Sequence, residues 1–517
     1  MKKQKYPIGE QDFREIRESD KIYIDKTMYI PSLLDNKYYF LSRPRRFGKS
    51  LFLSTLENFF CGRKELFEGL AVYDFNWNWE EYPVIRINLA EGSFSKKEGL
   101  EERLTEILEE YALKYGVVIS GSDPRAKFRN LIISINNATG KKVVVLIDEY
   151  EKPLLDSIYE RHHSDFQKKL AEFYSVLKSN EERIQFLFIT GVTRFGHLNI
   201  FSGFNNLTDI SLQNEFSAIC GITQIELETD LKAGIENLAK VRGTDYETAL
   251  LKLKEYYDGY HFSEKLEDIY NPYSLLYCLR FTQYASNWIL SGSSRYLIEN
   301  LKRSHYDLSN LENIKAGWST LMGVDATMED SVTLLYQSGY LTIKAYDDIR
   351  EVYTLGLPNK EVSEALYSAI IPYYLGGAYK ETREKAFDFI DMLEMGKAEE
   401  AMNWLKGYFS SIPYDVKLDY EADFQHVIYA FLSLVGLLSN ATLEKQTSDG
   451  RIDLLLTLRN YVYVFEFKLG NDSQKALDQI NSKNYALQWE PGNKTVFKIG
   501  IAFSPESRGI SSFSIEK

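Results

Sequence analysis

The chain is poor in cysteine, and its few cysteines are widely separated. Cys61, Cys220 and Cys278 are the only three among 517 residues. No CxxC pair and no Cys/His spacing links them, which excludes a disulfide framework and a cysteine-based zinc site. The 6 histidines also show no metal-ligand spacing, and we expect them to be structural.

The sequence also lacks long apolar runs. The first eleven residues contain Lys2, Lys3 and Lys5 but no apolar core for a signal peptide. No later stretch reaches the roughly 18 consecutive apolar residues of a membrane span. We therefore expect a cytoplasmic protein without a membrane segment. Hydrophobic residues make up 44% of the chain and no low-complexity tract is present, so we expect folding throughout.

Basic residues are outnumbered, with 61 Lys and Arg against 74 Asp and Glu and a net charge of −13. This balance argues against a protein that coats nucleic acid through charge alone. From Ala441 to Lys517 the two signs nearly cancel, which is permissive for a nucleic-acid substrate. A chain of 517 residues is too long for one core, so several domains are predicted.

The N-terminal third contains a strand, a basic loop and a helix in succession. Residues 38–42 (YYFLS) predict a buried strand, and the loop RPRRFGKS follows. Gly48-Lys49-Ser50 is the end of a P-loop, in which backbone N–H groups hold phosphates, the lysine reaches the β and γ oxygens, and the serine binds Mg²⁺. The tripeptide alone also fits a helix that begins after glycine. The first glycine of GxxxxGK[ST] is replaced by Arg43.

Further apolar strands at 84–89, 141–150 and 183–191 alternate with helical stretches, which predicts an α/β doubly wound sheet. The second of these strands ends in Asp148-Glu149. Asp148 can hold the hydration shell of Mg²⁺, and Glu149 can deprotonate the attacking water. The alternative is a solvated strand end. The order of strands and motifs favours a nucleotide-hydrolysing site.

The next strand end supplies candidate sensors of the γ-phosphate, namely Thr190, Thr193 and Arg194. Either threonine could instead cap a helix, and Arg194 could pair with an acid. Arg45 and Arg46 could neutralise phosphates or a DNA backbone, or form a solvated turn. The residues predicted to bind the nucleotide are Arg46, Phe47, Gly48, Lys49, Ser50, Leu51, Thr190 and Arg194.

From about Glu226 to Tyr379 helical patterns replace the strands. Within this region, residues 334–359 predict a helix end and a β-hairpin around Asp347-Asp348, similar to the wing of a winged helix.

The C-terminal segment predicts a second site, built on carboxylates. Residues 451–469 (RIDLLLTLRNYVYVFEFKL) predict two antiparallel strands that place Asp453 opposite Glu466 and Lys468 on the same face. Two adjacent carboxylates suit Mg²⁺ or Mn²⁺, with Lys468 orienting a water or stabilising a phosphate. The alternative is a plain Asp453–Lys468 ion pair. Glu421, on a helix predicted over 419–438, and Gln479 are candidate additional ligands or phosphate contacts.

These segments carry a resemblance to a known family. IGEQDFREIRESDKIYIDKT, FLSRPRRFGKSLFLSTLENFF, VVVLIDEYEKPL, ITGVTRFGHLNIFSGFNNLTDIS, YYDGYHF and YNPYSLL resemble AAA-ATPase-like proteins of bacteria. GRIDLLL, VFEFKL, ALDQINSKNYA and KIGIAFS resemble the PD-(D/E)XK nuclease module usually fused to them. The family often lacks the first P-loop glycine. The resemblance implies that YIDKT lies near the nucleotide base and that Gln479 and Tyr485 belong to the nuclease pocket.

The expected fold class is α/β in three domains. They are a P-loop NTPase parallel sheet (1–225), a helical lid with a winged-helix-like element (226–376) and an α/β restriction-endonuclease-like domain (377–517). The expected catalytic residues are Glu149, Asp453, Glu466 and Lys468. The expected metal ligands are Ser50, Asp148, Asp453, Glu466 and Glu421.

The expected function is an ATPase, with ATP and Mg²⁺ or Mn²⁺ as cofactors, coupled to a metal-dependent nuclease. The expected partner is nucleic acid, with DNA favoured over RNA; a homo-oligomer is left open. One alternative is a nucleotide-controlled switch or scaffold whose nuclease-like domain binds a partner without cleaving. Phosphorylation of a small molecule at the same P-loop is another.

Overall fold

The computed structural model divides the chain into two compact units. The first comprises Met1–Leu297 and Asn313–Val362, and the second comprises Ile298–Glu312 and Ser363–Lys517. The structure describes residues 4–194, 206–287, 297, 300–301, 311–323, 330–375, 379–411, 428, 441–447, 450–487, 489, 494–506 and 508–517.

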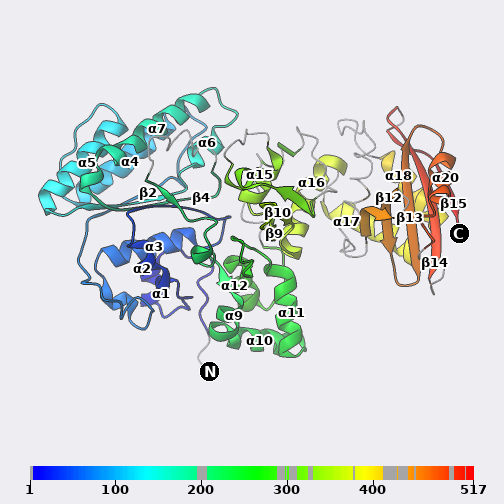
Figure 1. The fold of residues 1–517 in the computed structure, drawn as a ribbon, viewed down its shortest axis with the longest axis horizontal. Coiled ribbons are helices and arrows are strands. Elements are labelled where there is room, and N and C mark those ends of the chain that lie inside the picture. Colours follow the sequence, from blue (N-terminus) through cyan, green and yellow to red (C-terminus); the bar gives the residue numbers. More distant parts are fainter. Residues whose placement is uncertain are drawn as a thin grey trace. The chain divides into compact units, whose positions relative to one another are not determined.

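A five-stranded sheet forms the centre of the first unit (Figure 1). Its strands are β1 (Tyr38–Ser42), β2 (Val84–Asn88), β3 (Val143–Asp148), β4 (Ile184–Gly191) and β5 (Thr208–Asp209), in the order β2-β3-β4-β1-β5. Every pairing is parallel, so the carboxyl ends of the strands lie at one edge. All residues of β3 are buried, as expected for a strand covered on both faces. The predicted doubly wound sheet is confirmed.

Helices cover both faces of this sheet (Figure 1). They are α4 (Gly99–Lys114), α5 (Pro124–Thr139) and α7 (His163–Ser179) on one face and α3 (Lys49–Phe60) on the other. Val143 and Val145 of β3 belong to the apolar core under the first three helices. On the other face, Phe52 of α3 contacts Phe188 of β4. The shorter helices are α1 (Phe13–Glu18), α2 (Ile30–Leu33) and α6 (Lys152–Asp156).

The middle of the chain adds a group of helices to the first unit. They are α9 (Gln224–Asp230), α10 (Lys232–Arg242), α11 (Tyr246–Tyr257) and α12 (Pro272–Phe281), with the short strands β6 (Ile222–Thr223) and β7 (Ile269–Tyr270). Thr223 and Glu226 form a reciprocal capping box at the start of α9. Ile22 and Ile24 from the N-terminal segment pack against the apolar core of these helices. The N-terminal segment therefore packs against the helices of the middle region.

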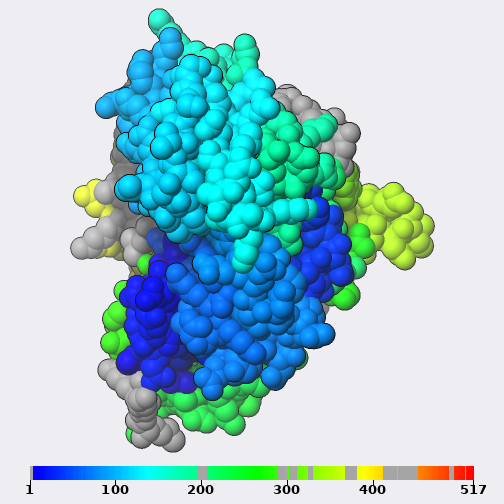
Figure 2. Space-filling model, turned by 90° about the vertical axis from the view of Figure 1, so that its left-hand side faces the viewer, coloured from blue at the N-terminus to red at the C-terminus, as the bar shows by residue number. Residues whose placement is uncertain are grey.

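A three-stranded antiparallel sheet completes the first unit. Its strands are β8 (Ile314–Ala316), β9 (Thr342–Asp347) and β10 (Val352–Gly356), in the order β8-β10-β9, with α14 (Trp318–Met322) and α15 (Ser331–Gln337) between β8 and β9. The predicted hairpin is present, and its turn follows Asp347. Figure 2 shows the tip of this hairpin standing out from the surface at the right. The helix end and the hairpin predicted for residues 334–359 are present, and together with β8 and α14 they are called the winged-helix-like element (Ile314–Gly356) below.

The second unit contains a mixed five-stranded sheet. Its strands are β11 (Ala441–Thr447), β12 (Gly450–Thr457), β13 (Tyr461–Leu469), β14 (Thr495–Ser504) and β15 (Gly509–Glu516), paired in this order. β13 and β14 are parallel and joined through α20 (Gln474–Ser482), whereas the other pairs are antiparallel. Three helices, α16 (Lys360–Leu375), α17 (Tyr379–Glu394) and α18 (Ala398–Phe409), precede the sheet.

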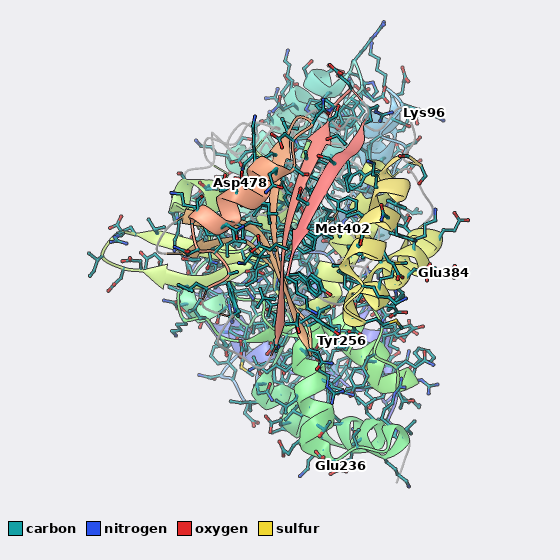
Figure 3. The ribbon with its side chains drawn as sticks, turned by 90° about the vertical axis from the view of Figure 1, so that its right-hand side faces the viewer. Lys96, Glu236, Tyr256, Glu384, Met402 and Asp478 are labelled. Atoms are coloured by element: carbon teal, nitrogen blue, oxygen red, sulfur yellow. The ribbon has the colours of Figure 1, made fainter. Side chains whose placement is uncertain are left out.

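Figure 3 shows α20, which carries Asp478, on one side of these strands. The helices that carry Glu384 and Met402 lie on the other side. The helix predicted over 419–438, with the predicted ligand Glu421, lies outside the described residues. Over the described part of the chain, no helix combines the length and hydropathy needed to cross a membrane.

Candidate functional site

The loop between β1 and α3 closes around the ammonium group of Lys49. α3 begins at this lysine, directly after Gly48, whose φ is 97°. Nothing lies within 4 Å of the position that a Cβ on Gly48 would take, so glycine is needed there for its left-handed backbone. Lys49 Nζ donates hydrogen bonds to the carbonyl oxygens of Arg43 at 2.9 Å and Pro44 at 3.2 Å. The predicted strand, loop and helix around Gly48-Lys49-Ser50 are therefore present.

Arg43, which replaces the first glycine of the P-loop pattern, is a buried anchor with 1% exposure. Its guanidinium donates to the carbonyl oxygens of Ser211 at 2.7 Å and Phe216 at 3.0 Å, and lies 4.2 Å from the ring centre of Phe262. Burial lowers the pKa of Arg43 to about 10, so the group stays charged at neutral pH. Among the non-glycine residues of the loop, positive φ occurs at Arg46, at 69°, and not at Arg43. The loop therefore turns without a glycine at its first position.

Asp148, at the end of β3, is connected to Ser50 by one arginine. Arg86 Nη2 donates to the carbonyl oxygen of Ser50 at 3.1 Å and lies 4.0 Å from Asp148 Oδ2. Thr190 Oγ1 donates to the other carboxylate oxygen, Oδ1, at 2.7 Å. Asp148 is 1% exposed, yet Oδ2 accepts no hydrogen bond from the described residues. A buried carboxylate oxygen with unused capacity, connected to the P-loop serine through Arg86, fits a divalent cation.

A cavity of about 400 Å³ lies beside the phosphate loop, and Glu149 lines it. The φ of Glu149 is 54°, a left-handed conformation that costs about 1–3 kcal/mol for a residue other than glycine. The basic residues lining the cavity are Lys26, Arg45, Arg46, Lys49 and Lys152. The apolar and aromatic side chains lining it include Ile22, Tyr23, Ile24, Tyr273 and Leu276. Cations for phosphates and apolar walls for a base fit a nucleoside triphosphate.

The segment YIDKT lines this cavity through Tyr23, Ile24 and Lys26, and its place near a nucleotide base stays a prediction. Lys26 also donates to both carboxylate oxygens of Glu226 on α9, at 2.6 and 2.7 Å. This ion pair connects the N-terminal segment to the helices of the middle region at the edge of the cavity.

The predicted sensor residues contact protein groups. Thr190 is fully buried and bonds to Asp148. Arg194 is 6% exposed and pairs with Asp209 at 2.8 Å, which is the alternative that its sequence position left open. Neither Thr190 nor Arg194 is among the described residues that line the cavity. Direct contact of these two residues with a nucleotide stays a prediction.

The β12–β13 ladder has the predicted register. Leu454 pairs with Phe465, and one step further along the same register Asp453 lies opposite Glu466. Within this ladder the turn at Arg459 follows the end of β12, as the sequence indicates.

The three charged side chains of this hairpin are held by hydrogen bonds. Asp453 Oδ2 accepts the backbone N–H of Phe467 at 2.8 Å. Glu466 is 1% exposed, and its Oε1 accepts from Lys468 Nζ at 2.8 Å. Lys468 therefore pairs with Glu466, whereas the alternative considered from the sequence pairs it with Asp453. Two carboxylates and one ammonium group lie along a short stretch of two neighbouring strands.

In the described residues, no group of three or more His, Cys, Asp and Glu side chains is placed to hold a metal ion. Asp453 and Glu466 supply two carboxylates, and Glu421 lies outside the described residues. Gln479 is half-buried on α20. Tyr485 is 3% exposed and packs in the apolar core. Its assignment to the nuclease pocket stays a prediction.

One known protein matches this chain over its whole length. It is described as "Uncharacterized protein in vnfD 5'region" of Azotobacter chroococcum mcd 1 and is 33% identical over 529 residues, which cover 100% of this chain and 99% of that protein. A family model described as "Predicted AAA-ATPase" matches residues 7–201. The chain belongs to the AAA-ATPase-like family.

A second model, for the PD-(D/E)XK nuclease superfamily, matches residues 419–513 of this AAA-ATPase-like protein. Among solved structures, the Aeropyrum pernix ORC2 protein, in ADPNP–ADP complexes, aligns with 72% of this chain and 96% of that chain. Its sequence identity is 12% and its TM-score is 0.28.

Two further residues of the AAA-ATPase-like site are not predicted from the sequence. Arg86 interrupts the apolar strand VIRIN, and a charged residue in a buried strand is a signal that could have drawn attention to it. Glu151 is fully buried, and burial together with the charge of Glu149 raises its pKa to about 7. The sequence shows only a second glutamate near Glu149, which gives no sign of burial.

Proposed function

We propose that this chain binds ATP with Mg²⁺, hydrolyses the ATP, and uses this turnover to control cleavage of nucleic acid by its C-terminal domain. The observation that carries the proposal is the contact of Arg86 with both Ser50 and Asp148, because it joins the phosphate loop to the acidic strand end. The matches to the ATPase and nuclease families support both halves of the proposal.

At the nucleotide site, each residue has a separate task. Lys49 binds the β and γ phosphate oxygens, and Arg45 and Arg46, which line the same cavity, neutralise phosphate charge. Ser50 and Asp148 hold Mg²⁺, which supplies positive charge to the phosphoryl oxygens. The Glu149 carboxylate orients the attacking water and accepts its proton.

At the hairpin, Asp453 and Glu466 hold Mg²⁺ or Mn²⁺, and the Lys468 ammonium group orients the attacking water beside them. The near neutrality of the segment from Ala441 onward permits approach of a polyanion. We propose DNA in preference to RNA as the substrate, and the cytoplasm as the compartment.

The test measures ATP hydrolysis and cleavage of DNA and RNA in Mg²⁺ or Mn²⁺, with and without ATP. Lys49→Ala should abolish hydrolysis and the effect of ATP on cleavage. Asp453→Ala should abolish cleavage and leave hydrolysis within about twofold of the wild type, since the two substitutions lie in different sites. Lys475→Ala, an exposed position on α20 with 77% side-chain exposure, is the control and should change neither activity.

A nucleotide-controlled switch whose C-terminal domain binds a partner without cleaving is the second candidate. The Lys468–Glu466 pair favours it, because this contact already neutralises the buried carboxylate. Absence of cleavage under every metal and nucleotide condition, with ATP hydrolysis intact, would support the switch and contradict the nuclease.

A further inference from the structure

The last residue of β4 and the three residues after it, Gly191–Arg194, form a segment that is held by the acidic motif following β3. Glu151 Oε1 accepts the backbone N–H of Val192 at 2.6 Å and that of Thr193 at 3.0 Å. Glu151 is fully buried. One carboxyl oxygen of Glu151 thus accepts from two successive backbone N–H groups at a neighbouring strand end, so both buried donors are satisfied.

Tyr150 contacts this segment at Thr193 and also the residue just before it, Thr190. Its N–H donates to the carbonyl oxygen of Thr190 at 3.3 Å, and its hydroxyl donates to that of Thr193 at 3.0 Å. Between these contacts, a Cβ on Gly191 would lie 2.4 Å from Glu151 Oε2 and 2.6 Å from the Tyr150 ring. The segment can approach so closely because Gly191 has no side chain.

The other end of the segment contacts the winged-helix-like element. The backbone N–H of Arg194 donates to Gln337 Oε1 on α15 at 2.9 Å, and Gln337 Nε2 donates to the carbonyl oxygen of Leu321 at 3.2 Å. Arg194 Nη2 pairs with Asp209 of β5 at 2.8 Å. The segment is therefore fixed between the acidic strand end and the winged-helix-like element.

Glu151 and Glu149 lie in different surroundings. Glu149 is among the described residues that line the cavity beside the phosphate loop, and Glu151 is not. The buried carboxyl group of Glu151 loses hydration, and the two N–H donors offset part of that loss. Glu151 is thus placed to hold the backbone and not to meet a ligand in the cavity.

We propose that Glu151 is a positioning residue for ATP hydrolysis. Glu151 fixes the backbone of Gly191–Arg194. This in turn keeps Thr190 hydrogen-bonded to Asp148, so the ends of β3 and β4 hold a constant position relative to the nucleotide. This role rests on the proposed ATPase function. Through the hydrogen bond between Arg194 and Gln337, the position of this segment is coupled to that of the winged-helix-like element.

The experiment compares the full chain carrying Glu151→Ala, Glu151→Gln or Gly191→Ala with the wild type. Amide hydrogen exchange of Val192 and Thr193 is measured without nucleotide, and kcat and KM for ATP are measured with Mg²⁺. Gly191→Ala leaves the acceptor in place but forces the segment away from it, and so provides an independent variant if Glu151→Ala does not fold. Glu160→Ala, at an exposed position nearby, is the control.

Glu151→Ala and Gly191→Ala should speed exchange at both amides and lower kcat at least tenfold, because small displacements of catalytic groups are costly, while KM stays within about twofold. Glu151→Gln keeps the acceptor oxygen and should restore protection and most of kcat. Unchanged exchange and kcat in Glu151→Ala, or loss of kcat in Glu151→Gln equal to that in Glu151→Ala, would overturn the proposal. If the proposed ATPase function itself is wrong, the wild type will not hydrolyse ATP. Amide exchange at Val192 and Thr193 would then still be faster in Glu151→Ala than in Glu151→Gln, so the two failures can be told apart.

Discussion

At the scale of single residues, Arg43 shows how a missing motif residue is replaced. Its guanidinium takes backbone carbonyls of residues 211–217 as acceptors, and its carbonyl oxygen accepts from Lys49. A glycine would supply only backbone freedom, which the observed loop does not need at this position. The sequence shows that Arg43 replaces the first P-loop glycine. It does not show the hydrogen bonds that Arg43 makes instead, since the acceptors lie far along the chain.

Arg43→Gly restores the general P-loop pattern, yet we expect it to destabilise the protein. The carbonyl groups of Ser211 and Phe216 would lose buried donors, and each stranded acceptor costs about 1–3 kcal/mol. The free energy of unfolding, measured by urea denaturation, should therefore fall by roughly 3 kcal/mol. The exposed Arg161→Gly is the control and should change it by no more than about 1 kcal/mol. An Arg43→Gly protein as stable as the wild type would contradict the anchoring role.

Asp258, in the segment YYDGYHF, follows α11 as its C-cap residue and is 1% exposed. Burial raises the pKa of Asp258 from 3.8 to about 6, and the charged or titratable groups around it include Lys254, His261, Asp268 and Tyr270. Between about pH 4 and pH 6 the folded state binds the proton more tightly than the unfolded chain. Stability from this group is therefore greatest at low pH and is lost as pH rises through about 6.

Asp258→Asn removes this titration and keeps the shape of the side chain. We expect the unfolding free energy of the wild type to fall relative to that of the variant by about 2 kcal/mol between pH 4.5 and 7.5. Urea denaturation of both proteins at the two pH values measures this difference. A difference that stays constant, or that grows in favour of the wild type at high pH, would show that the carboxyl is not held in its neutral form.

At the scale of elements, the long apolar strands follow from apolar periodicity and length. β3 and β4 are continuous apolar runs, and β12 and β13 are set in register by the short turn between them. The two-residue strand β5 carries no such pattern, because a strand that short has no periodicity. Its place beside β1 is decided by tertiary packing.

The approach of α20 to β14 depends on Gly500. A Cβ there would lie 2.5 Å from the backbone N of Leu477 and 2.5 Å from the backbone O of Ser473, and neither atom can move without the helix. Gly500→Ala should therefore lower the free energy of unfolding of the second unit by about 1–3 kcal/mol, as expected for overpacking. Gly407→Ala is a matched control, because Gly407 is exposed on α18 with nothing within 4 Å of its Cβ position. It should stabilise the helix by about 0.5–1 kcal/mol.

Chemical denaturation of the two variants, followed by circular dichroism, tests this pair of predictions. The predicted changes in unfolding free energy have opposite signs, although both substitutions add one methyl group to the same unit. Equal effects of Gly500→Ala and Gly407→Ala would contradict close packing of α20 on β14.

At the scale of the whole molecule, the fold class is predictable because each sheet is encoded locally. The long strands of the parallel sheet, the hairpin at Asp347 and the β12–β13 hairpin all have sequence signals in continuous segments. The site is predictable only in part. Lys49 and Asp148 belong to recognisable motifs, whereas Arg86 and Glu151 act through contacts with residues 36 or more positions away. No local pattern reports such contacts.

The most direct test of the account is ATP binding and single-turnover hydrolysis by the wild type and by Glu149→Gln. We predict that both proteins bind Mg²⁺-ATP with affinities within about twofold, because glutamine keeps the size of the side chain and the phosphate contacts are elsewhere. Hydrolysis by Glu149→Gln should fall on the order of 10²–10⁴-fold, since the acceptor of the water proton is lost. Wild-type hydrolysis rates in Glu149→Gln, or a wild type that does not bind ATP, would contradict it.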